Sequence, residues 1–199
     1  MVLDYSMMQW VLSIVVGVSL SRFINTLALI GRKKDQVKFD FLLISILFAT
    51  TTQMIHLWFN SPGYFSNIEG IYIPYMLLFL ITLIYATAIE SLLPNSSVLE
   101  TVGTVDLRDV YYQQKDLFYL AQFLIGVIML SLYIFYPQVE GMAFGLESKM
   151  VEIPILVILT IVFPIILIIS NNYFLHVFNM MLISLGFLGQ ILKYATTMT

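Results

Sequence analysis

Long apolar runs alternate with short polar segments along the whole chain. Six such runs lie at about 8–30, 40–59, 71–93, 117–136, 152–170 and 173–195. Each run has roughly the 20 residues that a helix needs to cross a bilayer, and none alternates with the period of a strand. The pattern therefore predicts an all-α fold, a polytopic transmembrane helical bundle of about six spans that forms one integral-membrane domain over residues 1–199.

Composition narrows the function classes. The chain is 60% hydrophobic and only 11% charged, whereas about a quarter of the residues of a soluble domain are charged. It has no cysteine and two histidines, and no HExxH motif, so we expect no metal site, no cofactor and no enzymatic activity. The formal charge of −3 and the lack of a basic tail argue against nucleic acid as a partner.

The basic residues predict the orientation of the bundle. Four of them, Arg32, Lys33, Lys34 and Lys38, lie between the first two spans, and Arg108 and Lys115 lie between spans three and four. Segments on the opposite side hold Lys149 and, near the end of span six, Lys193. By the positive-inside rule both termini face away from the cytoplasm, and we expect a multi-pass protein of the cytoplasmic (inner) membrane.

Ionisable groups inside the spans are the first functional candidates, because a charge at the centre of a span costs about 2.5–3.5 kcal/mol on insertion scales. Arg22 lies deep in span one, and we expect it to point into the bundle. Glu90 and Gln122 lie at a similar depth, which predicts an Arg22–Glu90–Gln122 cluster in the inner leaflet. Such a cluster is either a transport site or a structural ion pair that fixes the register of the helices against one another.

Two further spans carry polar residues at helical spacing. In span six these are His176, Asn179, Gln190 and Lys193, on one face. In span two, Gln53 and His56 make the face more polar towards the outer side, at a depth comparable with Gln190. These polar faces fit a hydrated path in which His176 relays protons. The alternative is that they form a buried row of hydrogen bonds between helices, with a structural role only.

Span one also carries a stripe of small or polar residues, Ser13, Gly17, Ser21 and Asn25, at intervals of four residues. Small residues let another helix approach closely in a membrane. The stripe fits either packing within the monomer or a homo-oligomer contact.

The segment at about 95–116 is the longest predicted cytoplasmic connection. Its apolar and aromatic residues fit a short interfacial helix that leads into span four. The alternative is a docking surface for a cytoplasmic protein, with the candidate residues Asp106, Arg108, Asp109 and Tyr111, together with Lys33 and Lys34.

Several of these residues also carry a resemblance. The run from Ser13 to Phe23, which contains Gly17-Val18-Ser19-Leu20-Ser21-Arg22, resembles the G-L-x-L-[ST]-R pattern in the first span of a widespread group of uncharacterised bacterial membrane proteins of about 200 residues. Gln53-x-x-His56-Leu57-Trp58 and Asp106-Leu107-Arg108-x-x-Tyr111 resemble further pieces of that group. The resemblance implies a multi-pass bundle in a bacterial cytoplasmic membrane, with Arg22, Gln53 and Arg108 as characteristic positions, and it implies no particular activity. The resemblance also leads us to expect a basic stretch directly after Tyr112. This chain has Gln113-Gln114-Lys115 at that place instead.

Two functions remain open at this point. In the first, the polar interior permeates or binds a proton, an ion or a small solute. In the second, the protein is a membrane accessory, regulator or effector, for example of a bacterial defence system, and acts through a partner on its cytoplasmic face. In both cases the lipid bilayer surrounds the spans.

Overall fold

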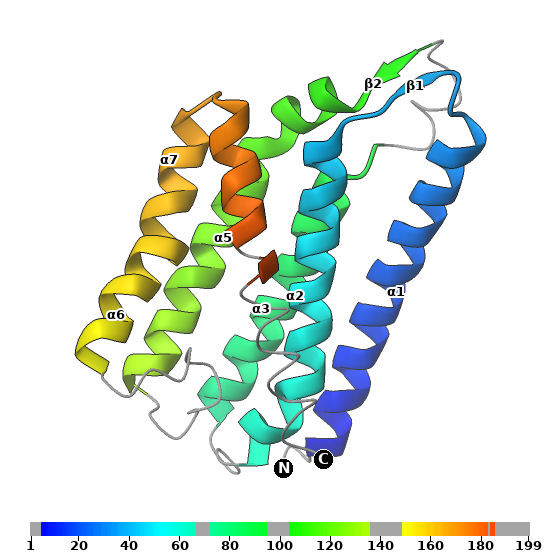
Figure 1. The fold of residues 1–199 in the computed structure, drawn as a ribbon. Helices are drawn as coiled ribbons and strands as arrows, with labels where there is room; N and C mark the ends of the chain where they lie inside the picture. The colour runs from blue at the N-terminus through cyan, green and yellow to red at the C-terminus, as the bar shows by residue number, and fades with distance from the viewer. Residues whose placement is uncertain (1–4, 67–71, 95–103, 136–148, 183, 186–199) are drawn as a thin grey trace.

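The computed structural model describes residues 5–66, 72–94, 104–135, 149–182 and 184–185. Its helices run up and down side by side and form a bundle (Figure 1). They are α1 (Tyr5–Arg32), α2 (Phe41–Ser66), α3 (Tyr72–Leu92), α5 (Leu107–Phe135), α6 (Lys149–Val157), the π-helical turn η2 (Ile158–Val162), α7 (Phe163–Ile169) and the helix Tyr173–Leu182. The all-α prediction is therefore confirmed for most of the described chain, apart from two very short strands.

Three of the described helices contain segments long and apolar enough to cross a membrane, Gln9–Arg32, Phe41–Trp58 and Leu107–Phe135. The other apolar segments in the described residues are shorter, Met76–Leu92, Ile153–Ile169 and Tyr173–Leu182. Many large apolar side chains are exposed on the outside of the bundle, among them Ile14, Ile24, Leu80, Leu124 and Ile165. A surface of this kind is compatible with a membrane protein, since lipid does not penalise exposed apolar side chains.

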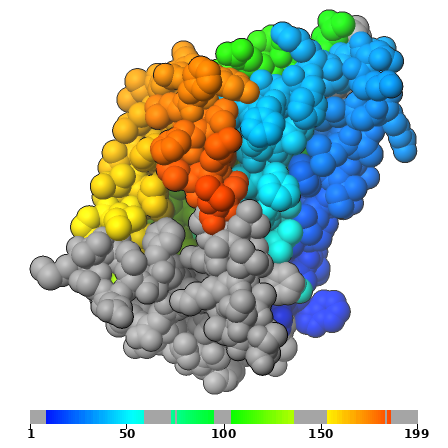
Figure 2. Space-filling view, in the orientation of Figure 1, coloured from blue at the N-terminus to red at the C-terminus, as the bar shows by residue number. Residues whose placement is uncertain are grey.

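The helix α2 lies at the centre of the bundle. Of its most apolar segment 61% is buried, against 22% for α1 and 39% for α5. Leu42, Leu43, Ile46 and Leu47 are fully buried in its first half. The helix Tyr173–Leu182, orange to red in Figure 2, lies beside α2, which is cyan. Polar residues on these two helices are therefore brought together inside the bundle.

Side-chain caps explain where several helices begin. Asp40 Oδ1 accepts hydrogen bonds from the backbone N–H groups of Leu42 (2.8 Å) and Leu43 (3.1 Å). Asn172 Oδ1 accepts one from the N–H of Phe174 (3.0 Å) at the start of the last described helix. Asp and Asn are favoured before a helix because they satisfy N–H groups of the first turn.

The helix α5 starts earlier than the sequence predicted. It begins at Leu107 rather than near residue 117, because Asp106 Oδ1 accepts the N–H of Arg108 (2.9 Å) and caps the helix there. The expected interfacial helix is instead the first turns of α5. Lys115, expected in a loop, therefore lies within this helix and is buried.

Two short strands tie together the loops before α2 and α5. β1 (Val37–Lys38) pairs in parallel with β2 (Val105–Asp106), and Lys38 Nζ donates a hydrogen bond to Asp106 Oδ2 (2.6 Å). This hydrogen bond lowers the pKa of Asp106 below its usual value and raises the pKa of Lys38. The pair therefore stays charged near neutral pH.

The helix formed by α6, η2 and α7 is continuous but irregular. It contains Pro154 in α6 and Pro164 at the start of α7, around the π-helical turn. Because proline has no N–H, Pro164 leaves the carbonyl of Thr160 without its ordinary helical donor. That carbonyl lies so close to Gly126 of α5 that an added Cβ would overlap it. The two helices thus approach closely at a position where α5 has no side chain.

Candidate functional site

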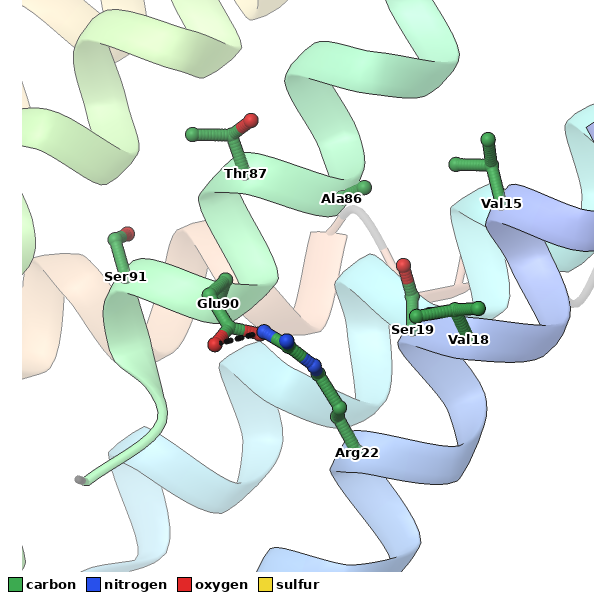
Figure 3. Close-up of a pocket in the computed structure, with 8 residues that line it drawn as sticks. All are labelled: Val15, Val18, Ser19, Arg22, Ala86, Thr87, Glu90 and Ser91. Carbon is green, nitrogen blue, oxygen red and sulfur yellow. Dashed lines mark ion pairs between the residues drawn. The ribbon is translucent and has the colours of Figure 1, made fainter. Parts of the chain in front are cut away.

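Arg22 and Glu90 form an ion pair between α1 and α3. The predicted pairing of these two residues is confirmed, but the prediction that Arg22 points into the bundle is wrong. Its side chain is 59% exposed and that of Glu90 is 52% exposed. Figure 3 shows the two side chains reaching towards each other across the mouth of a groove between the helices. The ion pair therefore lies on the side of the bundle rather than in its interior.

Gln122 does not line this groove. Its Nε2 instead donates a long hydrogen bond to Gln53 Oε1 (3.5 Å), which joins α5 to α2. The predicted three-residue cluster is therefore wrong in its third member. Depth along the helices groups Gln122 with Arg22 and Glu90. The rotation of α5 instead directs the amide of Gln122 towards α2.

Polar residues of two helices, α2 and Tyr173–Leu182, are buried inside the bundle. Gln53 and His56 of α2 are 5% and 7% exposed, and His176 and Asn179 of the last described helix are 0% and 4% exposed. The structure thus confirms that these side chains face inward. Gln190, which was expected to share a layer with His56, lies outside the described residues, as does Lys193.

His176 belongs to a buried hydrogen-bonded cluster with two tyrosines of α5. Its Nδ1 lies 2.5 Å from Tyr111 Oη and 3.0 Å from Tyr119 Oη, and the two phenol oxygens are 3.1 Å apart. Nε2 lies 2.9 Å from the carbonyl oxygen of Ser170. Because a carbonyl only accepts, Nε2 carries the hydrogen and Nδ1 of the neutral ring accepts a phenol hydrogen. We call these three residues the His–Tyr cluster.

Lys115 is buried one turn along α5 from Tyr111. Its Nζ donates hydrogen bonds to the carbonyl oxygens of Ile168 (2.5 Å) and Leu167 (3.4 Å), at the end of α7, and to Asp116 Oδ1 (2.9 Å). A cation at the C-terminal end of a helix satisfies its last carbonyls and interacts favourably with the helix dipole. Lys115 therefore fixes α7 against α5 beside the His–Tyr cluster.

Sequence reasoning missed Tyr119 and the structural role of Lys115. Once α5 is known to start at Leu107, the eight-residue spacing between Tyr111 and Tyr119 is about two helical turns, which places both near one side. The sequence does not reveal this spacing, because it predicts an interfacial helix at about 95–116 that is separate from span four, and Tyr111 and Tyr119 then belong to different elements.

The predicted docking residues divide into two groups. Tyr111 is fully buried in the His–Tyr cluster, so its assignment to a docking surface is wrong. Asp106 is engaged by Lys38 and by the start of α5. Arg108 is exposed, and its guanidinium carbon lies 4.8 Å from the ring centre of Tyr173 and 5.9 Å from that of Tyr112. Exposed or partly exposed side chains also include Asp109, Lys33 and Lys34.

The stripe on α1 faces mostly outward. Ser13 Oγ accepts a hydrogen bond from Trp58 Nε1 of α2 (2.8 Å), but Gly17, Ser21 and Asn25 are exposed. A Cβ added at Gly17 would meet nothing within 4 Å. Packing within the described monomer therefore accounts for only the first residue of the stripe, and the homo-oligomer contact stays a prediction.

Comparison with known proteins adds no relatives to this description. No protein-family model, curated protein or solved structure matches the chain. The candidate sites therefore rest on the residues and their geometry.

Proposed function

We propose that the chain is a non-enzymatic membrane protein of about six spans that binds and relays protons through its polar interior. The observation that carries this proposal is the His–Tyr cluster, in which three groups able to exchange protons lie within hydrogen-bonding distance of one another. Its members come from α5 and from the helix Tyr173–Leu182, which is the start of the predicted sixth span.

Each group in the cluster can donate and accept a hydrogen bond. In the neutral state Nε2–H of His176 donates to Ser170 and Nδ1 accepts from a phenol. When Nδ1 takes up a proton it becomes a donor, and a phenol oxygen then accepts from it. The proton is thus accommodated by turning hydroxyl groups, with no movement of the helices.

The orientation inferred from the basic residues supports proton exchange with the cytoplasm. Arg32 ends α1, and Lys38 and Arg108 lie in β1 and at the start of α5, at the end of the bundle where α7 turns into the last described helix (Figure 1). The positive-inside rule assigns this end to the cytoplasm. His176 lies just inside it, four residues into the helix that follows Asn172.

The buried polar residues continue from this end towards the other. Gln122 lies eleven residues after Tyr111 on α5, which is about 16 Å along the helix at 1.5 Å per residue. Its partner Gln53 precedes His56 by about one turn of α2. Amide groups do not exchange protons as phenols and imidazoles do. The geometry therefore supports proton binding at the cytoplasmic end most directly, and passage beyond Gln53 requires water.

Proton uptake by liposomes that contain the purified full chain tests the proposal. The measurement follows an internal pH dye after an external pH step, with potassium and valinomycin present to set the membrane potential, and separate assays follow potassium and chloride. His176→Phe and Tyr119→Phe remove proton-exchanging groups and keep ring packing. Ser131→Ala, also on α5, removes a hydroxyl that bonds only its own helix at Val127, and serves as the control.

We expect the wild type and the Ser131→Ala variant to take up protons equally. We expect uptake in the other two variants to fall at least about a hundredfold, because a positioned proton-transfer group typically contributes about 10²–10⁴-fold. Equal uptake by the His176→Phe variant, or no proton movement by the wild type at any pH or voltage, contradicts the proposal.

A second candidate function is that of an accessory protein with a cytoplasmic partner. The observation that favours it is Arg108, which is held over two aromatic rings while its side chain stays exposed. Cross-linking to a partner should then be lost on Arg108→Ala or on charge reversal at Lys33 and Lys34. Partner capture that survives all three substitutions would exclude this function.

A further inference from the structure

The groove that holds the Arg22–Glu90 pair has the form of a lateral binding site. It has a volume of about 470 Å³ and lies between α1 and α3. Val15 and Val18 line one side, and Ala86 and Thr87 line the other. Figure 3 shows the charged pair at one end of these apolar and small side chains. A molecule with a charged end and an apolar body fits this arrangement.

The two charged side chains of the groove are exposed on the outside of the bundle rather than buried. Both side chains of the pair are more than half exposed, although they belong to apolar helices whose other exposed residues include Val18, Ile24 and Leu83. A guanidinium has five N–H donors, and a single carboxylate does not engage all of them. In a bilayer the outward donors and acceptors of the pair need a polar partner, because hydrocarbon supplies none.

The two sides of the groove have opposite hydrogen-bonding character. On α3, Thr87 Oγ1 donates its hydrogen to the carbonyl of Leu83 (2.9 Å), and Ser91 Oγ donates its hydrogen to the carbonyl of Ala88 (2.8 Å). These hydroxyl groups can therefore only accept further hydrogen bonds. Together with Glu90 they make α3 the acceptor side, whereas Arg22 makes α1 the donor side.

The groove lies beside the end of α3, whereas α1 continues for ten residues from Arg22 to its end at Arg32. Glu90 is two residues before the end of α3 at Leu92, about 3 Å along the axis at 1.5 Å per residue. The chain leaves the helix there, before Pro94. A helix end of this kind is expected near the membrane interface, and this holds whichever side of the membrane faces the cytoplasm.

We propose that this groove binds the phosphoethanolamine head group of a membrane phospholipid, with the phosphate on Arg22 and the ammonium on Glu90, Thr87 and Ser91. The phosphate accepts the free guanidinium hydrogens. The ammonium has three N–H donors, which the acceptor side of α3 engages. A phosphocholine head group has no N–H donor, and a phosphoglycerol head group has no cation, so neither satisfies both sides. The apolar part of the groove contacts the glycerol and the start of the acyl chains.

Competitive retention of lipids tests this proposal. The purified full chain is placed in micelles that contain phosphatidylethanolamine, phosphatidylcholine and phosphatidylglycerol with identical acyl chains in equal amounts. Native mass spectrometry then counts the lipid that stays bound. Glu90→Gln, Arg22→Gln and Thr87→Val alter the groove. Thr52→Val is the matched control, because Thr52 likewise donates its hydroxyl hydrogen to its own helix, at Phe48 (2.8 Å), but lies on α2 outside the groove.

We expect the wild type and the Thr52→Val variant to prefer phosphatidylethanolamine over the other two lipids by about tenfold, the ratio for one charge-assisted hydrogen bond. Glu90→Gln should abolish the preference over phosphatidylcholine, and Arg22→Gln should reduce retention of all three lipids. Thr87→Val keeps the ion pair and should lower the preference a few-fold, which keeps the test valid if a charge variant does not fold.

Three results would overturn the proposal. The first is equal retention of the three lipids by the wild type. The second is full displacement of the lipid by millimolar free phosphoethanolamine, which would make the ligand a soluble solute. The third is efficient disulfide cross-linking between two copies of a Val18→Cys variant, which would place a second chain over the groove. Proton uptake should be unchanged by Thr87→Val, so this proposal and the proposed function fail separately.

Discussion

Replacing Gly126 with alanine tests the close contact between α5 and the π-helical turn. A Cβ at this position would overlap the carbonyl oxygen of Thr160, and would lie 2.7 Å from its Cβ and 2.8 Å from its carbonyl carbon. Ordinary carbon–carbon contacts are about 3.5–4.0 Å. The obstructing atoms belong mostly to the backbone, so the helices must move apart by about an ångström. Gly17→Ala is the matched control, since nothing lies within 4 Å of its added Cβ.

The two substitutions share one favourable effect and differ in one unfavourable effect. Alanine is favoured over glycine inside a helix by about 1 kcal/mol, and this applies to both positions. Overpacking of a tight contact costs about 1–3 kcal/mol and applies only to Gly126. The free energy of unfolding of the Gly126→Ala variant should therefore lie about 1–3 kcal/mol below that of the Gly17→Ala variant.

Thermal unfolding of the two variants in the same detergent, followed by tryptophan fluorescence, measures this difference. For a chain of this size 1 kcal/mol corresponds to about 2–4 °C in Tm. We expect the Gly17→Ala variant to melt at or slightly above the wild type, and the Gly126→Ala variant to melt at least about 2 °C below the control. Equal Tm values would refute the close approach of α5 and η2.

Three further predictions concern side chains that fix helix ends and loops. Lys115→Met should lower the free energy of unfolding by about 2–3 kcal/mol, because the last carbonyls of α7 lose a charge-assisted donor, and chemical denaturation in detergent would show it. Asp40→Ala should cost about 1 kcal/mol through loss of the cap of α2, measured in the same way. The pKa of Asp106 is lowered by Lys38, so its stabilising effect is present above the ordinary value of 3.8 and is lost as the pH falls through the lower folded value. The protection factors of the β1 amides, which compare their hydrogen exchange with that of an unfolded peptide at the same pH, should accordingly be constant from about pH 5 to 8 and fall only in acid, and this fall should be absent in the Asp106→Asn variant.

The pairing of Arg22 with Glu90 shows how far depth along a helix can be read from a sequence. Both residues were placed in one layer by counting from helix ends, and the structure joins them. The count could not give the direction of the side chains, which depends on how α1 is rotated against α3. For the same reason it placed Gln122 with the wrong partners, whereas the structure joins this residue to Gln53.

The His–Tyr cluster illustrates the opposite case. The sequence singled out His176 as a relay candidate, but it assigned Tyr111 to a surface and did not consider Tyr119. The cap at Asp106 extends α5 by about three turns beyond the predicted span and carries Tyr111 into the bundle. A cap of this kind adds few apolar residues, so an apolar run does not reveal it.

The sequence by itself determined that the chain is helical and apolar, where most helices lie, and which of their residues are polar at depth. These properties depend on short-range periodicity and on length, which neighbouring residues fix. Only the tertiary structure decided that the Arg22–Glu90 pair faces outward in a groove, that His176 meets two tyrosines, and that Lys115 holds the end of α7. These contacts join residues far apart in the chain, and they depend on the rotation and contact of whole helices, which close packing of many side chains sets together.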